Sequence, residues 1–233
     1  MRVVEHAGVD GAPVVLLIHG LTDSLESFAG MVEELTPGHT VLTYDRRGWG
    51  RSRDDAPPTS LADHAQDAID VLAGRRATVV GHSYGGVVAL KAATMRPDLV
   101  ASLVVFEPTV PFTDWWPDHD EMMRRSLDLK PMLKRWSAGM PRRTPEQRAA
   151  DDISMARDFS FVETAPFEFA DVSMPCLVGG SVDTTPWDYE SAERLSELLD
   201  ADVVMFRDAG HPAHRTHARE FADLTRRAVA LGC

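Results

Sequence analysis

Cysteine is scarce in this chain, with only two among 233 residues. Cys176 lies in an apolar, strand-like run and Cys233 is the last residue, so the sequence excludes a disulfide framework and indicates a reducing compartment. The apolar core of a signal peptide is missing behind Met1, and the apolar run 14–18 is far too short to cross a membrane. We therefore expect a soluble, cytoplasmic protein.

Basic residues are also fewer than acidic ones. Lys and Arg together number 24 against 36 Asp and Glu, which gives a formal net charge of -12. Such a surface repels phosphate backbones and anionic lipids, so we expect neither nucleic acid nor a membrane as a partner. The chain has no internal repeat and no low-complexity tract, and nothing in it indicates an oligomeric state.

Short apolar, β-branched runs alternate along the chain with segments of helical periodicity. With 44% hydrophobic residues, the chain is large enough for one α/β domain with an insertion. Runs that are apolar on both faces are typical of parallel strands, and their alternation with helices predicts a mostly parallel, doubly wound sheet. The expected strands are 2–6, 14–18, 40–44, 77–80, 100–106, 174–180 and 203–206, and the expected helices of the sheet domain are 25–35, 60–72, 87–95, 187–199 and 214–231.

The segment 77–95 carries the most informative motif. A buried strand leads into Gly81-His82-Ser83-Tyr84-Gly85-Gly86 and then into a helix that ends before Pro97. Gly81 and Gly85 flank the serine because a side chain at either place would collide with the neighbouring backbone. The pattern predicts a strained, exposed serine at the carboxyl end of a strand, with a helix N-terminus behind it. These are the properties of a nucleophile elbow.

This G-x-S-x-G turn in its strand–helix setting resembles the α/β-hydrolase family, and the resemblance runs over most of the chain. It implies the α/β-hydrolase fold, with a core domain of residues 1–110 and 173–233. It also implies a small helical cap at 111–172, inserted after the strand that follows the nucleophile helix. Ser83 is then the nucleophile, and no cofactor is required.

The family resemblance extends to two loops. His19-Gly20-Leu21 resembles the family's oxyanion loop, which implies that the backbone N–H groups of Leu21 and Tyr84 stabilise the oxyanion. The segment 45–52 resembles the D-x-R-G-x-G-x-S pattern of the family, in which the glycines form a turn and the arginines hold neighbouring loops. We expect its role to be structural.

The base and the acid follow later in the chain. Asp208-Ala209-Gly210-His211-Pro212 resembles the family's closing loop, which makes His211 the general base. Gly180-Ser181-Val182-Asp183 fits the family's G-x-x-D pattern, so we expect Asp183 to be the triad acid. Glu107, at the end of strand 100–106, is the alternative acid, because some family members place it there.

Histidines at three-residue spacing suggest a metal site as another interpretation. His211, His214 and His217 lie in one stretch, and the last two share a helical face. The chain has no H-E-x-x-H motif and no cysteine pair beside them, so we expect no metal. His82, inside the elbow, is expected to be a packing residue.

The segment 111–172 is rich in aromatic residues and methionine, and short helices are expected at 118–127, 131–138 and 145–159. Most of these side chains are expected to pack the cap on the core. We name Trp115, Trp116 and Trp136 as candidate substrate-binding residues, because flat aromatic side chains suit the wall of an apolar pocket. The charged run 142–152 is interpreted as a solvated face.

The function expected from these features is hydrolysis of a small, apolar or aromatic carboxylic ester or thioester through an acyl-enzyme. A small-molecule substrate is the expected partner. Three alternatives remain open: cleavage of a carbon–carbon bond beside a ketone, a non-hydrolytic lyase, cyclase or perhydrolase reaction, and a ligand-binding protein without turnover.

Overall fold

The computed structural model describes residues 1–117, 142–164 and 166–232, together with Glu121, Arg124, Lys130, Pro131 and Lys134. These residues contain one seven-stranded sheet in the order β1-β3-β2-β4-β5-β6-β7. Only the edge strand β1 runs antiparallel to its neighbour, and the other pairings are parallel. The strands are β1 (Val3–His6), β2 (Val14–Ile18), β3 (Thr40–Tyr44), β4 (Ala77–His82), β5 (Val100–Phe106), β6 (Cys176–Ser181) and β7 (Asp202–Phe206).

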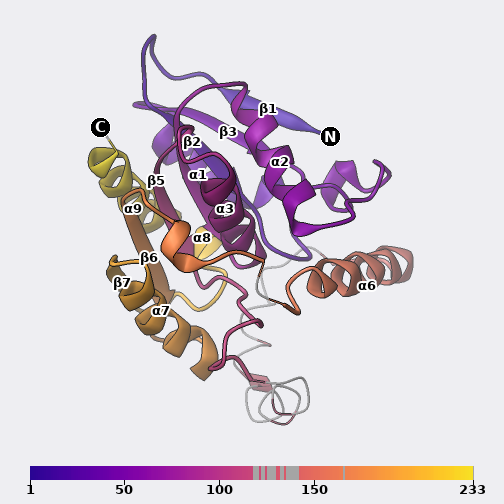
Figure 1. The fold of residues 1–233 in the computed structure, drawn as a ribbon. Coiled ribbons are helices and arrows are strands. Elements are labelled where there is room, and N and C mark those ends of the chain that lie inside the picture. Colours follow the sequence, from indigo (N-terminus) through magenta and orange to yellow (C-terminus); the bar gives the residue numbers. More distant parts are fainter. Residues whose placement is uncertain are drawn as a thin grey trace.

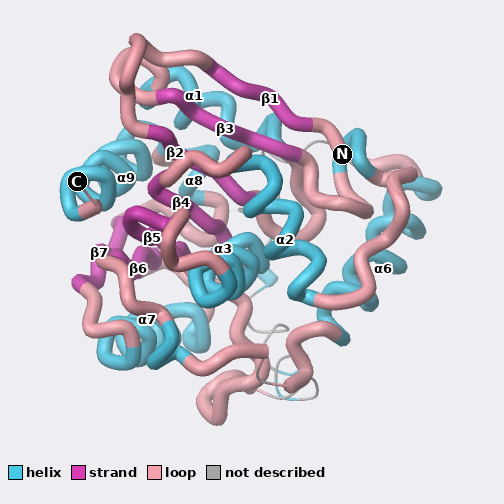
Figure 2. The backbone as a smooth tube through the Cα atoms, turned by 45° about the horizontal axis from the view of Figure 1, so that its top comes forward, coloured by secondary structure: helices cyan, strands magenta, loops and turns pink. Residues whose placement is uncertain are grey.

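Helices cover both faces of the sheet, as Figures 1 and 2 show. One apolar cluster joins the sheet to α2 (Leu61–Leu72), α3 (Tyr84–Met95) and α7 (Pro186–Leu198). The cluster on the opposite face joins it to α1 (Ala29–Leu35) and α9 (Ala218–Leu231). The chain therefore has the predicted α/β-hydrolase fold with a doubly wound sheet. Among the described residues, no helix combines the length and the apolar character that a membrane span needs.

Most predicted elements are present, and the differences have local causes. The helix predicted at 25–35 begins with a 3-10 turn, Leu25–Phe28, before α1. The helix predicted at 214–231 is wrong as a single element: it is divided into α8 (Ala213–Thr216) and α9, because His217 leaves helical geometry with φ -128° and ψ 45°. The helices predicted at 118–127 and 131–138 fall largely on residues outside the described part of the chain.

The segment between β5 and β6 contributes α6 (Pro145–Ser160) and a 3-10 turn, Phe169–Asp171. Pro145 occupies the first turn of α6, and Thr144 and Gln147 form a reciprocal capping box at its start. In both views α6 lies outside the two helix layers, beside α2 (Figures 1 and 2).

The buried face of α6 is polar. Its buried residues are Asp151, Ser154 and Asp158, at the spacing of a single helical face. Asp151 is only 4% exposed and forms ion pairs with Arg53 and Arg143. The interpretation of 142–152 as a solvated face was therefore wrong at Asp151, because a charged side chain on this helix is buried against partners of opposite charge.

Candidate active site

Ser83 lies at the junction of β4 and α3 in a strained backbone conformation. Its φ is 54° and its ψ is -127°, a region that residues with a side chain rarely adopt. The surrounding glycines permit this turn: a Cβ at Gly81 would lie 2.3 Å from the carbonyl oxygen of Gly85, and a Cβ at Gly85 would lie 2.1 Å from that of Ile18. The strand–turn–helix geometry predicted for an elbow is thus present around Ser83.

His211 lies at the same edge of the sheet and pairs with Glu107. The distance from His211 Nδ1 to Glu107 Oε2 is 2.6 Å. Glu107 directly follows β5 and is fully buried, and its other oxygen, Oε1, accepts a hydrogen bond of 2.8 Å from the backbone N–H of Ser181. Because a carboxylate can only accept, Nδ1 of His211 carries the hydrogen, which leaves Nε2 with a lone pair.

Asp183, the acid expected from the G-x-x-D pattern, is engaged elsewhere. Its Oδ2 accepts a hydrogen bond of 2.8 Å from the backbone N–H of Asp208. The expected pairing of Asp183 with His211 is therefore corrected to Glu107, the alternative carboxylate. The physical reason is that the loop after β6 turns Asp183 toward the backbone of the closing loop, while the end of β5 points Glu107 at the imidazole.

A backbone contact ties His211 to the elbow. His82, the residue before Ser83, has its Nε2 2.7 Å from the carbonyl oxygen of His211. The His82 ring also packs against those of His211 and His214, with centroids 4.7 and 3.9 Å apart. His82 therefore has the packing role that the sequence predicted, and it links the backbone of the proposed base to the residue before Ser83.

The three histidines considered as metal ligands have separate partners. His211 contacts Glu107, His214 Nε2 lies 3.0 Å from Asp23 Oδ2, and His217 Nδ1 lies 2.9 Å from the hydroxyl of Thr216. Within the described residues, Asp23, His82 and His214 do bring one ligand atom each to within 4.8 Å of the others. Arg215 already pairs with Asp23, however, so a cation there would face a fixed positive charge.

A second buried carboxyl group lies beside the His211–Glu107 pair. Asp188 offers an oxygen within 4.8 Å of ligand atoms of both Glu107 and His211, and it is 6% exposed. Burial and the charge of Glu107 raise the pKa of Asp188 to about 7. The sequence did not identify this residue, because Thr185-Pro186 just before it is the pattern of a helix start, in which Asp188 is an ordinary first-turn residue. The helix does start there, with the backbone N–H of Asp188 donating to the Thr185 hydroxyl at 3.2 Å.

The oxyanion loop follows β2 and lies against the serine. A Cβ at Gly20 would lie 2.9 Å from the Cβ of Ser83, so the close approach of the loop requires glycine here. Leu21, expected to contribute an N–H, comes next, and Tyr84 begins α3 directly after Ser83. The two expected donors therefore come from different elements, and their role as an oxyanion hole stays a prediction. The hydroxyl of Thr109 lies 3.4 Å from Ser83 Oγ.

The pKa values of two histidines at the site are shifted in opposite directions. Burial lowers the pKa of His211, but the hydrogen bond and charge of Glu107 raise it by more, so the pKa lies above the ordinary histidine value. Burial and the nearby charge of Arg46 lower the pKa of His19 to about 3, so this imidazole is neutral. A serine hydroxyl next to an imidazole base that is backed by a buried carboxylate is suited to attack on an activated carbonyl, with the expected backbone donors stabilising the oxyanion.

Two of the three candidate substrate-binding tryptophans belong to the described residues, and both contact other parts of the chain. The indole N–H of Trp115 donates to Ser191 of α7 at 3.0 Å, and the Arg194 guanidinium lies 5.3 Å from its ring centroid. Trp116 is partly buried against the core cluster. Trp136 lies outside the described residues. Substrate binding by the three stays a prediction.

Known proteins resemble this chain in sequence and in fold. A family model described as the alpha/beta hydrolase family matches residues 15–224. A protein named "Putative carbamate hydrolase RutD" from Caulobacter vibrioides is 37% identical over 130 residues, which cover 54% of this chain and 46% of that protein. The protein of the same name from Rhizobium rhizogenes is 25% identical over 246 residues, with 90% of each chain covered.

The first of these matches means that the chain spans just under half the length of that curated relative. A solved structure described as a lipase-esterase related protein from Clostridium acetobutylicum superimposes with a TM-score of 0.76 and 16% identity, covering 97% of this chain and 98% of that one. At this identity the likeness shows the fold alone.

Proposed function

Because this chain belongs to the alpha/beta hydrolase family, we propose that it is a serine hydrolase of small carboxylic esters or thioesters. Ser83 is the nucleophile, His211 is the general base, and Glu107 takes the place of the aspartate that the sequence pattern favoured. The backbone N–H groups of Leu21 and Tyr84 form the oxyanion hole, and residues 111–172 form a cap over the site.

One observation carries this proposal: the contact of 2.6 Å between His211 Nδ1 and the buried Glu107, beside a serine held at positive φ. A buried carboxylate at this distance fixes the imidazole tautomer and stabilises the imidazolium that forms during attack. The hydrogen bond between His82 and the His211 backbone supports the same arrangement, because it links the base to the residue that precedes the nucleophile.

The reaction follows from these roles. Ser83 Oγ attacks the carbonyl carbon as its proton passes to Nε2 of His211, and negative charge develops on the carbonyl oxygen. His211 then protonates the leaving alcohol or thiol, and an acyl-serine remains. Water attacks this acyl group after giving a proton to His211, and the carboxylic acid departs as Ser83 regains its hydrogen.

Two observations bear on the substrate. Thr109, beside Ser83, is followed by the buried Val110 and then by Phe112, which packs edge-on against Phe167 with ring centroids 5.6 Å apart. Aromatic side chains on this segment support an apolar acyl or leaving group. The similarity to proteins named as carbamate hydrolases adds carbamates as a second carbonyl class.

A fluorophosphonate probe tests the nucleophile. It should label the wild-type protein once, at Ser83, and labelling should vanish in Ser83→Ala. Ser102→Ala is a matched control, because Ser102 is a buried serine on the neighbouring strand β5 with its hydroxyl 2.8 Å from that of Thr78; this variant should label normally. Labelling that persists in Ser83→Ala would refute the assignment.

A substrate panel tests the reaction class. Wild type and Ser83→Ala should be compared on acetyl, butyryl and aromatic nitrophenyl esters, thioesters, lactones, carbamates and vinylogous diketones. We expect hydrolysis of esters with a preference for the apolar acyl groups, and none in Ser83→Ala. Equal rates on acetyl and longer esters would remove the apolar preference. Diketone cleavage without ester hydrolysis would favour the carbon–carbon hydrolase, and labelling without any turnover would favour non-hydrolytic chemistry.

A further inference from the structure

The peptide that supplies the Leu21 N–H is held through its carbonyl oxygen. Gly20 O accepts one hydrogen bond from His19 Nδ1 at 2.8 Å and another from Arg46 Nη2 at 3.1 Å. Because a peptide unit is planar and its C=O and N–H point in opposite directions, holding the Gly20 oxygen fixes where the Leu21 N–H points. Arg46 Nε also donates to His19 O at 3.0 Å, so one guanidinium binds two successive carbonyl groups of this loop.

The tautomer of His19 is fixed by the same residue. The backbone N–H of Arg46 donates to His19 Nε2 at 3.0 Å. Nε2 is therefore the acceptor and Nδ1 carries the hydrogen that reaches Gly20 O. Arg46 thus sets the oxyanion peptide directly through its guanidinium and indirectly through the imidazole.

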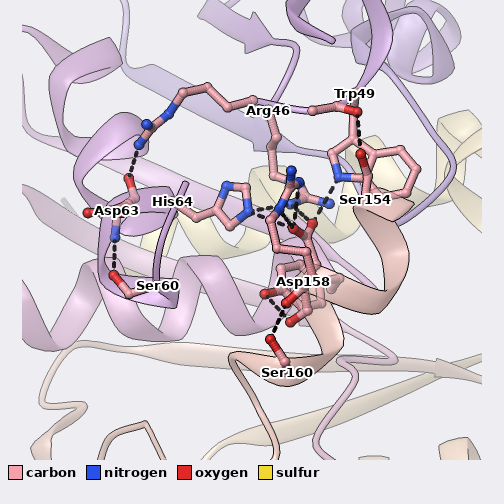
Figure 3. A network of polar contacts seen from close by, with 12 residues as sticks. Arg46, Trp49, Ser60, Asp63, His64, Ser154, Asp158 and Ser160 are labelled. Atoms are coloured by element: carbon pink, nitrogen blue, oxygen red, sulfur yellow. Dashed lines mark hydrogen bonds and ion pairs between the residues drawn. The ribbon is translucent and has the colours of Figure 1, made fainter. Parts of the chain in front are cut away.

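Arg46 itself is held by a residue from the inserted segment. Its Nη1 lies 2.9 Å from Oδ2 of Asp158, on α6, and both side chains are fully buried. Figure 3 shows Arg46, Trp49 and His64 all pointing at this carboxylate. Trp49 Nε1 donates to Asp158 at 2.9 Å, and His64 Nε2 lies 3.2 Å from it. Among the described residues, the carboxylate that pairs with Arg46 thus lies 112 positions away in the chain, and it also pairs with its neighbour Arg157.

Asp158 also reaches the second expected oxyanion donor. The hydroxyl of Tyr84 donates to the carbonyl oxygen of Asp158 at 2.8 Å. The ring of Tyr84 lies under the Arg46 guanidinium, with 4.7 Å from the guanidinium carbon to the ring centroid. The side chain of Asp158 thus connects to the Gly20–Leu21 peptide, and its backbone connects to the residue that follows Ser83.

We propose that Asp158 is a positioning residue for the oxyanion hole, which it fixes from both sides through Arg46 and Tyr84. The inference rests on the proposed hydrolase function, and it assigns to the inserted segment a role in transition-state stabilisation. Without the carboxylate, the buried Arg46 loses the ion pair that holds it among the described residues and can turn away from the His19 and Gly20 carbonyls, which releases the Gly20–Leu21 peptide to rotate. The N–H of Leu21 then no longer points at the oxyanion.

Asp158→Asn is the main test, because it keeps the shape of the side chain and removes its charge. Loss of one oxyanion donor typically lowers kcat by about 100- to 1,000-fold, so partial misplacement should lower it by about 10- to 100-fold. KM should change by less than about 3-fold, because the donors act mainly on the transition state. Tyr84→Phe keeps the aromatic ring and the backbone N–H of residue 84 but removes the hydrogen bond from the hydroxyl to the Asp158 carbonyl oxygen, and it should lower kcat by a smaller factor.

A pair of ketone inhibitors separates positioning from a general structural effect. An aryl trifluoromethyl ketone forms an oxyanion with the serine, so its affinity for Asp158→Asn should fall by about the same factor as kcat. The methyl ketone of the same shape should bind wild type and Asp158→Asn with equal affinity. Ser154→Ala is the matched control: it lies one turn earlier on α6, its hydroxyl donates to Gly48 O at 3.0 Å, and it does not touch Arg46 or Tyr84 in the described contacts. This variant should keep the wild-type kcat and inhibitor affinities.

The outcomes separate this inference from the proposed function. Wild type that binds the trifluoromethyl ketone no better than the methyl ketone would overturn the hydrolase function and the inference with it. Wild type that discriminates between them, with a folded Asp158→Asn that discriminates equally, would overturn the inference alone. If Asp158→Asn does not fold, Tyr84→Phe decides the question: unchanged kcat and unchanged discrimination in that variant would also overturn it.

Discussion

Replacing Glu107 with glutamine should disable the base by changing the tautomer of His211. Glu107 makes two different contacts: Oε1 accepts the Ser181 N–H at 2.8 Å, and Oε2 faces His211 Nδ1 at 2.6 Å. In Glu107→Gln the amide oxygen must keep the first contact, because an amide N–H₂ cannot accept from a backbone N–H. The amide N–H₂ is then turned toward His211, where only an acceptor can face it. Nδ1 must lose its hydrogen to Nε2, and Nε2 can no longer take the proton of Ser83.

The expected magnitude follows from this tautomer change. A triad acid replaced by its amide in the wrong tautomer lowers kcat by about 10,000-fold. At about 1.4 kcal/mol for each factor of ten, this is about 5.5 kcal/mol of lost transition-state stabilisation. Asp183→Asn should stay within about 3-fold of wild type, because an asparagine oxygen can still accept the Asp208 N–H.

The assay is the kcat for nitrophenyl butyrate in wild type, Glu107→Gln and Asp183→Asn, with circular dichroism to establish that each is folded. A Glu107→Gln enzyme that retains a tenth of wild-type kcat, beside a crippled Asp183→Asn, would show that the tautomer reasoning is wrong and that Asp183 is the acid. If both variants are strongly impaired, the two carboxylates share the role.

Two further predictions concern pH. Asp188 has a pKa of about 7 when folded against an ordinary value of 3.8, so the native state binds an extra proton between these values and the free energy of unfolding falls as pH rises across them. Asp188→Asn should therefore remove this fall in the free energy of unfolding, which is on the order of a few kcal/mol and is measured by urea unfolding between pH 4 and pH 8. Burial raises the pKa of Asp158, but the hydrogen bond from His64 and the charge of Arg46 lower it by more, so it lies well below 3.8. The stability that the ionised carboxylate contributes is therefore fully present above pH 3.8 and is lost as pH falls through the lower native pKa. The stability difference between wild type and Asp158→Asn should shrink as pH falls from about 5 to about 2, and a constant difference would contradict this.

Periodicity predicted the fold well because the central strands of the sheet are nearly all core. The strands β4 and β5 are buried along their whole length, so their sequences are continuous β-branched and apolar runs that resemble little else. The start of α2 was also predictable from the sequence, because serine is a common N-cap residue, and the Ser60 side chain does accept a hydrogen bond from the backbone N–H of Asp63. The break between α8 and α9 was missed, because a single non-helical residue, His217, leaves the hydrophobic period almost unchanged.

The site was predictable only as far as local pattern reaches. The turn at Ser83 needs glycines because a Cβ at Gly81 or Gly85 would collide with neighbouring backbone, so the residues next to the serine in the sequence are enough to identify it. The choice between Glu107 and Asp183 depends on which loop points its carboxylate at His211, and that is decided by long-range packing. The same limit applies to Asp151 and Asp158: in the sequence they are charges on a helix, and in the fold they are buried against arginines from distant segments.

Buried charge on α6 has a consequence for how this protein is built. An apolar face would attach the inserted segment to the core with little dependence on orientation, because hydrophobic contact is not directional. The buried ion pair of Asp158 with Arg46 instead permits only arrangements in which the carboxylate meets the guanidinium, since an unpaired buried charge costs several kcal/mol. Arg46 in turn holds the carbonyl that orients the Leu21 N–H. In the proposed function, this ion pair therefore couples the placement of the segment to the geometry of the oxyanion peptide, so docking of α6 should also prepare that peptide for the transition state.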